Sequence, residues 1–314
     1  MEIYNKIVNL YADFPGIVIA LGTFDGIHIG HQKIISRAVN LAKQINGTSV
    51  VFTFSNHPLS VVAPQRCPLQ LVTEDYKAEL IQELGVDVLL TIPFTPQFLK
   101  ISALQFIDLA MKNLSPKHIV VGPNYFFGYK RSGTPQFLEQ AGAQHGFNVE
   151  IHPTVYVNDT NDMIVSSTLI RQMIVAGNID QAAQLLGRPV KVKGIVIHGA
   201  KRGRALGYPT INLSIAKQLI LPADGVYAVS LSIGNIEYNG IANIGNNPTF
   251  NGIDRCLEVH ILDYSGDLYG QSVIVSFLKY IRGQITFPGP AELKLQICHD
   301  INVAQFYFPP VHVK

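Results

Sequence analysis

The densest group of residues that could do chemistry lies at Gly22–His31, which reads GTFDGIHIGH. It follows an apolar run at 17–21 and precedes a segment of helical periodicity, so we expect a loop that opens a helix. A helix N-terminus attracts anions through its unpaired N–H groups and partial positive charge. Glycines allow close backbone approach, and His28 and His31 add two donors that could neutralise charge on a transferring phosphate. The segment predicts a polyphosphate site.

A second polar group, SSTLIR, occupies 166–171. Ser167 or Thr168 is expected to cap a helix N-terminus, with Arg171 in the first turn. A cation in that position opposes the helix dipole, a penalty that an intervening anion would relieve. The alternative is an ordinary cap with a solvated arginine. Taken alone, the segment favours this alternative. Taken together with the histidine pair, the segment favours a phosphate-binding site.

The second half contains a cationic, glycine-rich segment in which three glycines stand four residues apart. A proline then precedes Thr210 and Asn212, alternate residues that would share a strand face and offer neutral oxygens to Mg²⁺. The alternative is a glycine-rich turn entering an edge strand, and the P-loop pattern is absent. The segment comprises Gly199, Lys201, Arg202, Gly203, Arg204, Gly207 and Pro209.

Three further positions carry weaker signals. Glu258 lies on the polar face of an alternating strand and could accept a proton from a hydroxyl, although such a glutamate is more often simply solvated. Asn124 and Phe127 follow a predicted strand, where aromatics could line a pocket for a flat ring or belong to the core. His57, before a proline, could be a site residue or a turn residue.

Composition limits the class of protein. The chain has 314 residues, 47% apolar and 15% charged, which predicts two folded domains with sizeable cores. A net charge of +2 without a dense basic run argues against a nucleic-acid partner. Three distant cysteines, no recognisable signal peptide and no apolar run of roughly 18 residues predict a soluble cytoplasmic protein. The oligomeric state is left open.

The elements that position these residues differ between the halves. Up to residue 186, short apolar strands alternate with helical segments, a pattern typical of a doubly wound α/β parallel sheet. In such sheets ligands bind at the carboxyl ends of the strands, where the loop at 22–31 would lie. Beyond residue 187, short strands separated by turn residues predict a small antiparallel β-barrel with a C-terminal helix at about 290–301. The predicted domains are therefore 1–186 and 187–314.

The motifs also resemble known families. GTFDGIHIGH with SSTLIR, VGPNYFFGYKRSG and TFSNHP resembles bacterial FAD synthetase, a nucleotidyltransferase that transfers AMP from ATP to FMN and releases pyrophosphate. The resemblance implies that His28 and His31 stabilise the transition state at the α-phosphate. It also implies flavin contacts by His57, Asn124 and Phe127, and ATP contacts by Gly22, Phe24, Asp25, Ser167, Thr168 and Arg171. TFSNHP departs from the usual pattern, in which many members have an acid and a proline before His-Pro.

From Pro189 almost to the C-terminus, GRALGYPTIN, GIANIGNNPTF, LEVHILDYSGDLYGQ and the segments around them resemble riboflavin kinase, a six-stranded barrel that phosphorylates riboflavin from ATP. The resemblance implies that Thr210 and Asn212 bind Mg²⁺, that Glu258 is the general base and that the 199–207 loop closes over ATP.

The order of the two resemblances matches the bifunctional riboflavin kinase/FMN adenylyltransferase family and predicts an enzyme that makes FMN and then FAD. One alternative is a chain in which the kinase half alone is active. Another alternative is a sensor that binds flavin or nucleotide without turnover. The set of Glu258, Thr210 and Asn212 argues against a sensor, because binding alone needs no general base.

Overall fold

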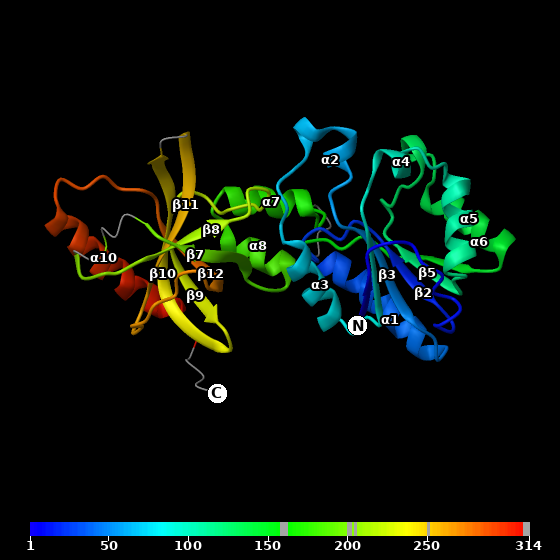
Figure 1. Ribbon diagram of the computed structural model, residues 1–314, viewed down its shortest axis with the longest axis horizontal. Helices are drawn as coiled ribbons and strands as arrows, with labels where there is room; N and C mark the ends of the chain where they lie inside the picture. The colour runs from blue at the N-terminus through cyan, green and yellow to red at the C-terminus, as the bar shows by residue number, and fades with distance from the viewer. Residues whose placement is uncertain (158–162, 200–202, 204–205, 250–251, 310–314) are drawn as a thin grey trace. The chain divides into compact units, whose positions relative to one another are not determined.

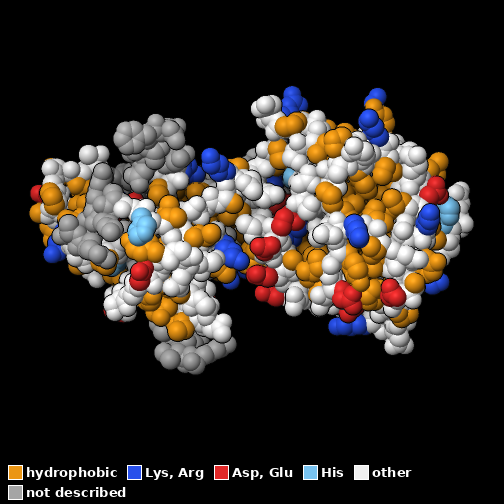
Figure 2. Space-filling view, viewed as in Figure 1, with side chains coloured by type: hydrophobic (Ala, Val, Ile, Leu, Met, Phe, Trp, Pro, Cys, Tyr) orange, Lys and Arg blue, Asp and Glu red, His pale blue; other side chains and the backbone are white. Residues whose placement is uncertain are grey.

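The computed structural model describes residues 1–157, 163–199, 203, 206–249 and 252–309. By its internal contacts the chain divides into two compact units, Met1–Ser167 and Thr168–Lys314. This division lies before the predicted boundary at 186, since the helix at Ile179–Leu186 packs on strands of the second unit. Charged side chains of both signs are spread over the visible face of each unit (Figure 2). Among the helices in the described ranges, none combines the length and apolar character needed to cross a bilayer.

The first unit contains a six-stranded sheet in the order β1-β4-β3-β2-β5-β6, with every pair parallel (Figure 1). The doubly wound prediction is thereby confirmed. The strand order reverses at β2, which lies between β3 and β5, and ligands bind outside the carboxyl ends of strands at such a switch point. The strands are β1 Glu2–Tyr4, β2 Val18–Leu21, β3 Ser49–Phe54, β4 Val88–Ile92, β5 His118–Val121 and β6 Asn148–Ile151.

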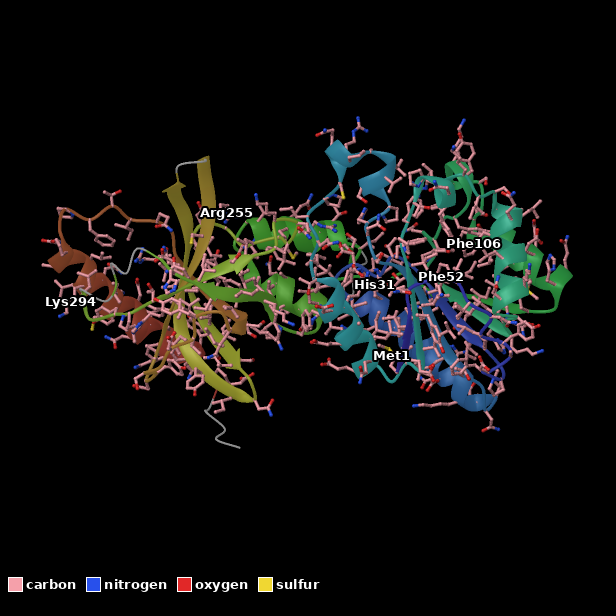
Figure 3. The ribbon with its side chains drawn as sticks, viewed as in Figure 1. Met1, His31, Phe52, Phe106, Arg255 and Lys294 are labelled. Carbon is pink, nitrogen blue, oxygen red and sulfur yellow. The ribbon has the colours of Figure 1, made fainter. Side chains whose placement is uncertain are left out.

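Helices cover both faces of this sheet because β2 is apolar on both sides. Val18 and Ala20 belong to one core cluster with α1 and α3, whereas Ile19 and Leu21 belong to another with α5 and α6. In the second cluster Phe52 and Phe106 meet edge to face at 5.8 Å (Figure 3). The helices are α1 Ile29–Gln44, α2 Leu59–Val62, α3 Glu74–Glu83, α4 Pro96–Leu99, α5 Ala103–Asn113 and α6 Pro135–His145, with 3₁₀ turns η1 Pro64–Arg66 and η2 Tyr129–Arg131.

The second unit is built on a closed barrel in the order β10-β11-β8-β7-β12-β9, in which every pair is antiparallel. The predicted barrel and C-terminal helix are confirmed. Alternate residues such as Leu257 and Val259 are fully buried, so the neighbouring Glu258 is placed on the outer surface of the barrel. The elements are α7 Ser167–Val175, α8 Ile179–Leu186, β7 Val190–Ile197, β8 Ile211–Ile215, β9 Gly225–Ile233, β10 Ile236–Thr249, β11 Gly252–Ile261, β12 Ser272–Arg282, α10 Pro290–Ala304 and η3 Gln305–Tyr307.

Candidate functional site

The loop Gly22–His31 connects the carboxyl end of β2 to the first turn of α1, as predicted. His28 is the N-cap residue, and its Nδ1 accepts a hydrogen bond from the backbone N–H of His31 at 3.3 Å. The two imidazole rings stack with centroids 3.6 Å apart. A Cβ on Gly30 would approach the His28 ring to 3.2 Å, so glycine permits this tight packing. The structure therefore brings both imidazoles together at a helix N-terminus.

The backbone of this loop is left-handed at three positions. Phe24, Gly26 and Ile27 have φ values of 48°, 82° and 40°, and such values are unfavourable for the two residues that carry a Cβ. Phe24 and Ile27 are each 1% exposed, so their packing in the core holds the conformation. The Gln32 side chain also donates to the carbonyl of Ile27 at 2.9 Å. The loop is a fixed structure built by its own buried residues.

Asp25 and Ser167 are tied to one another through the backbone of the loop. The Ser167 hydroxyl donates to the carbonyl oxygen of Asp25 at 2.8 Å, and the Asp25 carboxylate accepts from the N–H of Leu71 at 3.1 Å. Helix α7 begins at Ser167, so the predicted N-cap role of Ser167 or Thr168 is wrong and both lie in its first turn. Arg171 follows one turn later along the helix. Ser167 and Asp25 are therefore brought together, as the site requires.

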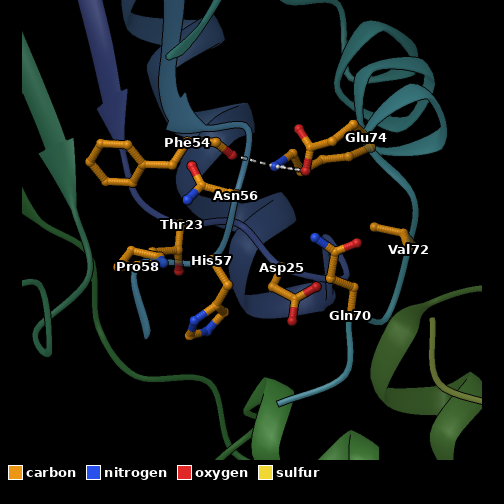
Figure 4. Close-up of a pocket in the computed structure, with 10 residues that line it drawn as sticks. Thr23, Asp25, Phe54, Asn56, His57, Pro58, Gln70, Val72 and Glu74 are labelled. Atoms are coloured by element: carbon orange, nitrogen blue, oxygen red, sulfur yellow. Dashed lines mark hydrogen bonds and ion pairs between the residues drawn. The ribbon is translucent and has the colours of Figure 1, made fainter. Parts of the chain in front are cut away.

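A small recess opens where the loop after β2 meets the segment after β3 (Figure 4). His57 lines it, and its Nδ1 accepts from the N–H of Leu59 at 3.1 Å, which assigns the proton of a neutral ring to Nε2. The volume of the recess is about 20 Å³, which suits a water molecule rather than a flavin ring. Its lining residues are Thr23, Asp25, Phe54, Asn56, His57, Pro58, Gln70, Val72, Glu74 and Lys77.

A buried lysine that lines this recess holds two chain segments together. Lys77 is 5% exposed, and its Nζ donates to the carbonyl of Phe54 at 2.7 Å and to the carboxylate of Glu74 at 3.0 Å. Burial raises the pKa of the Glu74 carboxyl, and the charge of Lys77 partly offsets that rise. The lysine thus connects the end of β3 to the first turn of α3.

The two other predicted flavin contacts are placed differently. Asn124 is exposed just after β5, at the same edge of the sheet as the loop 22–31. Phe127 is 7% exposed in the core, where its ring lies 5.2 Å from that of Phe106 and 6.1 Å from that of Phe137. Phe127 therefore packs between α5 and α6, and its contact with a flavin stays a prediction.

In the second unit, a cavity of about 350 Å³ opens on the outer surface of the barrel. A row of polar residues crosses three strands there, because Asn212 on β8 is directly opposite Glu258 on β11, which is opposite Asn243 on β10. Opposed residues share a face, so the three side chains are neighbours. The cavity is lined by Gly203, Leu206, Tyr208, Thr210, Val226, Ile241, Ala242, Asn243, Glu258, His260, Arg282, Gln284, Ile285, Phe287, Leu293, Ile297 and Asp300.

Gly203, from the glycine-rich segment, lines this cavity. A Cβ on Gly199 would approach the Asn212 amide nitrogen to 2.1 Å, and one on Gly203 would approach the Tyr208 carbonyl to 2.3 Å. The Pro209 carbonyl oxygen is 2.8 Å from Nδ1 of His260, which fixes the chain just before Thr210. Gly207 has a left-handed φ of 85°. The predicted ATP contacts Lys201 and Arg204 lie outside the described residues.

Sequence reasoning missed a polar group that closes the cavity. Gln284 donates to Oδ1 of Asn243 at 2.9 Å and to the carbonyl of Ile244 at 2.7 Å. Arg282 forms a bidentate ion pair with Asp300 of α10, which is 1% exposed, at 2.7 to 3.1 Å. Asn243 is opposite Glu258 only because of the register in which β10 and β11 pair. The sequence shows that Asn243 is polar, but it does not reveal this register.

The fold and these sites define a protein that joins a nucleotidyltransferase-type α/β unit to a flavokinase-type barrel. The FAD synthetase family model matches residues 11–169, and the riboflavin kinase family model matches residues 186–308. The chain is 37% identical over 313 residues to the bifunctional riboflavin kinase/FMN adenylyltransferase of Buchnera aphidicola from Schizaphis graminum, covering 98% of this chain and 99% of the relative. It is 36% identical over 311 residues to the protein of the same name from Escherichia coli K12, covering 98% of each.

Among solved structures, the chain is similar to a macrolide-efflux protein from Streptococcus pneumoniae, with a TM-score of 0.88 and 32% identity. The similarity covers 98% of this chain and all of that one. The two family models and the relatives that match over nearly the whole length show that the chain belongs to the bifunctional riboflavin kinase/FMN adenylyltransferase family.

Proposed function

We propose that this chain catalyses two successive reactions. Residues 187–314 phosphorylate riboflavin with ATP to give FMN, and residues 1–186 transfer AMP from a second ATP to FMN, giving FAD and pyrophosphate. The proposal is carried by the presence of one assembled set of phosphate-directed side chains in each unit. These are the stacked His28–His31 pair and the row that contains Glu258. Membership of the family over nearly the whole length supports both activities.

In adenylyl transfer, an oxygen of the FMN phosphate attacks the α-phosphorus of ATP as the bond to the pyrophosphate oxygen breaks. The imidazoles of His28 and His31, at the positive end of α1, stabilise the negative charge that develops on the α-phosphate. Because the attacking phosphate is already anionic, the step needs no strong base. The residues that hold the ATP phosphates and shape the site are Gly22, Phe24, Asp25, Ser167, Thr168 and Arg171, and His57 and Asn124 contact the flavin.

In the kinase reaction, the oxygen of the riboflavin 5′-hydroxyl attacks the γ-phosphorus of ATP as the bond to the bridging oxygen of ADP breaks. Glu258 accepts the proton of that hydroxyl, and ADP leaves. Glu258 lies half-buried in the cavity wall, beside polar neighbours on both adjacent strands. Phosphoryl transfer depends chiefly on positioning and charge neutralisation, so one base and a covering loop suffice for the protein's part. The 199–207 loop, which includes Gly199, Lys201, Gly203, Arg204 and Gly207, covers ATP, and Pro209 contacts ATP just beyond this loop.

Thr210 and Asn212 are the residues that would hold Mg²⁺ for this kinase. A hydroxyl and an amide oxygen are hard neutral donors of the kind that Mg²⁺ accepts beside substrate phosphates. The fit is supported by the firm seating of Asn212, which is 7% exposed, packed under Gly199 and 3.6 Å from the Cys256 sulfur through its Oδ1. When bound, the ion would neutralise phosphate charge. Chelation should abolish FMN formation, and Mg²⁺ should restore it.

The decisive experiment incubates the full chain with riboflavin, ATP and Mg²⁺ and separates the flavins by chromatography. FMN should appear first and FAD should follow. FMN that accumulates without FAD would support the alternative in which the kinase half alone is active. Tight flavin binding without ATP consumption would support a sensor.

A cytoplasmic location fits this activity. A reducing compartment would keep Cys67, Cys256 and Cys298 as thiols.

A further inference from the structure

Asn56 makes an unusual set of contacts just beyond the end of β3. Its Oδ1 accepts from the N–H of Phe94 at 2.7 Å, and its Nδ2 donates to the carbonyl of the same residue at 3.1 Å. Nδ2 also donates to the hydroxyl of Ser60 at 3.0 Å. The amide therefore uses its acceptor and both of its donors at once.

These bonds continue the pairing of two parallel strands. The β3–β4 ladder pairs Phe54 with Ile92, and the N–H of Ser55 donates to the carbonyl of Ile92 at 2.9 Å. One step further, the Asn56 side chain bonds to both backbone groups of Phe94, which follows β4. The rings of Phe54 and Phe94 pack edge to face at 5.0 Å beside it. The side-chain amide thus joins the two chain segments where they leave the sheet.

The same amide closes a turn around two wall residues of the recess. Its bond to Ser60 brackets His57 and Pro58, and the N–H of Leu59 inside this turn donates to Nδ1 of His57. In Figure 4, Asn56, His57 and Pro58 lie on the same stretch of chain beside the recess. The orientation of the His57 ring therefore depends on a turn that is anchored to β4 through Asn56.

We propose that Asn56 is a positioning residue for adenylyl transfer, which fixes the turn that presents His57 to FMN. The inference rests on the proposed function of the first unit. The Ser55-Asn56 pair departs from the acid and proline that many members of the family carry before His-Pro. The structure gives this departure a role: the amide supplies bonds to the neighbouring strand that a proline side chain cannot make.

The test measures FAD formation from FMN and ATP by the full chain carrying Asn56→Ala. Asn56→Ala removes three hydrogen bonds. The KM for FMN should rise roughly 5- to 30-fold, while kcat stays within about twofold. The amide of Phe94 should also exchange its hydrogen faster. Phosphorylation of riboflavin by the same protein should be unchanged, because its site lies in the other unit.

The matched control is Asn113→Ala, which removes an amide that donates to the carbonyl of Leu109 in α5 and does not line the recess. It should leave the KM for FMN unchanged. If Asn56→Ala does not fold, Ser60→Ala removes one of the same bonds and should raise that KM by a smaller factor.

An unchanged KM for FMN in the folded variant, or an equal rise in the control, would overturn the inference. A wild-type chain that forms no FAD at all would instead overturn the proposed function of the first unit. The two failures are therefore distinguishable.

Discussion

The two proposed phosphate sites are built by different structural means. In the first, the histidine pair sits where a parallel strand ends and a helix begins, and left-handed backbone at Phe24 and Ile27 shapes the loop. In the second, Asn212, Glu258 and Asn243 come from three antiparallel strands and meet through the pairing register. One site is made by the path of the main chain, and the other is made by side chains that line up across a sheet.

This difference determines how each site can fail. A site made by a loop and a helix start depends on a few adjacent residues and their buried anchors. A site made across strands depends on the alignment of the whole barrel, and here also on the Arg282–Asp300 pair that joins β12 to α10. We therefore expect each catalytic substitution to abolish one activity and leave the other unchanged. We also expect substitutions that lower the stability of the barrel to affect FMN formation alone.

The largest expected effect comes from His28→Ala. Loss of one donor to the developing charge should lower FAD formation about 10²- to 10³-fold. Riboflavin phosphorylation should continue at its normal rate, as measured in the same chromatographic assay. His145→Ala changes an exposed histidine in the last turn of α6 and serves as the control. Equal loss of both activities would contradict the independence of the two sites.

The reciprocal substitution is Glu258→Gln, which keeps the shape of the side chain and removes its basicity. FMN formation from riboflavin should fall about 10²- to 10⁴-fold, the usual range for a general base. FAD formation from added FMN should persist. Glu237→Gln, at an exposed position of β10, should change neither rate. Normal FMN formation by Glu258→Gln would remove Glu258 from its proposed role.

Asp300→Asn tests the barrel rather than the chemistry. It leaves the largely buried Arg282 guanidinium without its charged partner, which should lower the free energy of unfolding of the second unit by about 3 kcal/mol. On heating, FMN formation should be lost at a lower temperature than FAD formation from FMN. Asp267→Asn, on an exposed turn, is the matched control. Simultaneous loss of both activities would show that the units do not unfold separately.

The smallest effect concerns Arg37 of α1 and Glu150 of β6, which form a bidentate pair that is about 38% exposed. The hydrogen bonds from Arg37 lower the pKa of Glu150 below its ordinary value of 4.5. The pair therefore stabilises the first unit above that value, and the stabilisation is lost as pH falls through the lowered pKa. Arg37→Ala should cost at most about 0.5 kcal/mol at neutral pH, measured by denaturant unfolding. An undiminished cost in strong acid would contradict this assignment.

The sequence predicted the first site better than the second for a physical reason. An apolar run, glycines and helical periodicity are local signals. They placed a strand that ends at Leu21 correctly, and a helix that begins where the following loop ends. The left-handed conformations of Phe24 and Ile27 were not predictable, because distant core contacts impose them. The role of Phe127 was equally unreadable, since an aromatic after a strand can line a pocket or fill a core, and the structure places this one in the core.

In the barrel, β7 at Val190–Ile197 is one of the expected short strands, whereas β10 is longer and extends past Ala242 to Thr249. The extension contains Gly, Asn and Pro residues that favour turns locally, yet it is paired with β11 along its whole length. Cross-strand pairing overrode local preference there. Asn243, which lies in this extension, was missed with it.

The left-handed loop between β2 and α1 also has a consequence for how tightly substrate is held. Its shape is maintained by the buried rings and methyls of the protein itself, so nucleotide association does not have to order this stretch of chain. Ordering one backbone residue costs about 1–2 kcal/mol, and here that entropy is lost when the chain folds. A substitution that loosens Phe24 or Ile27 would weaken association without removing any direct contact with the nucleotide.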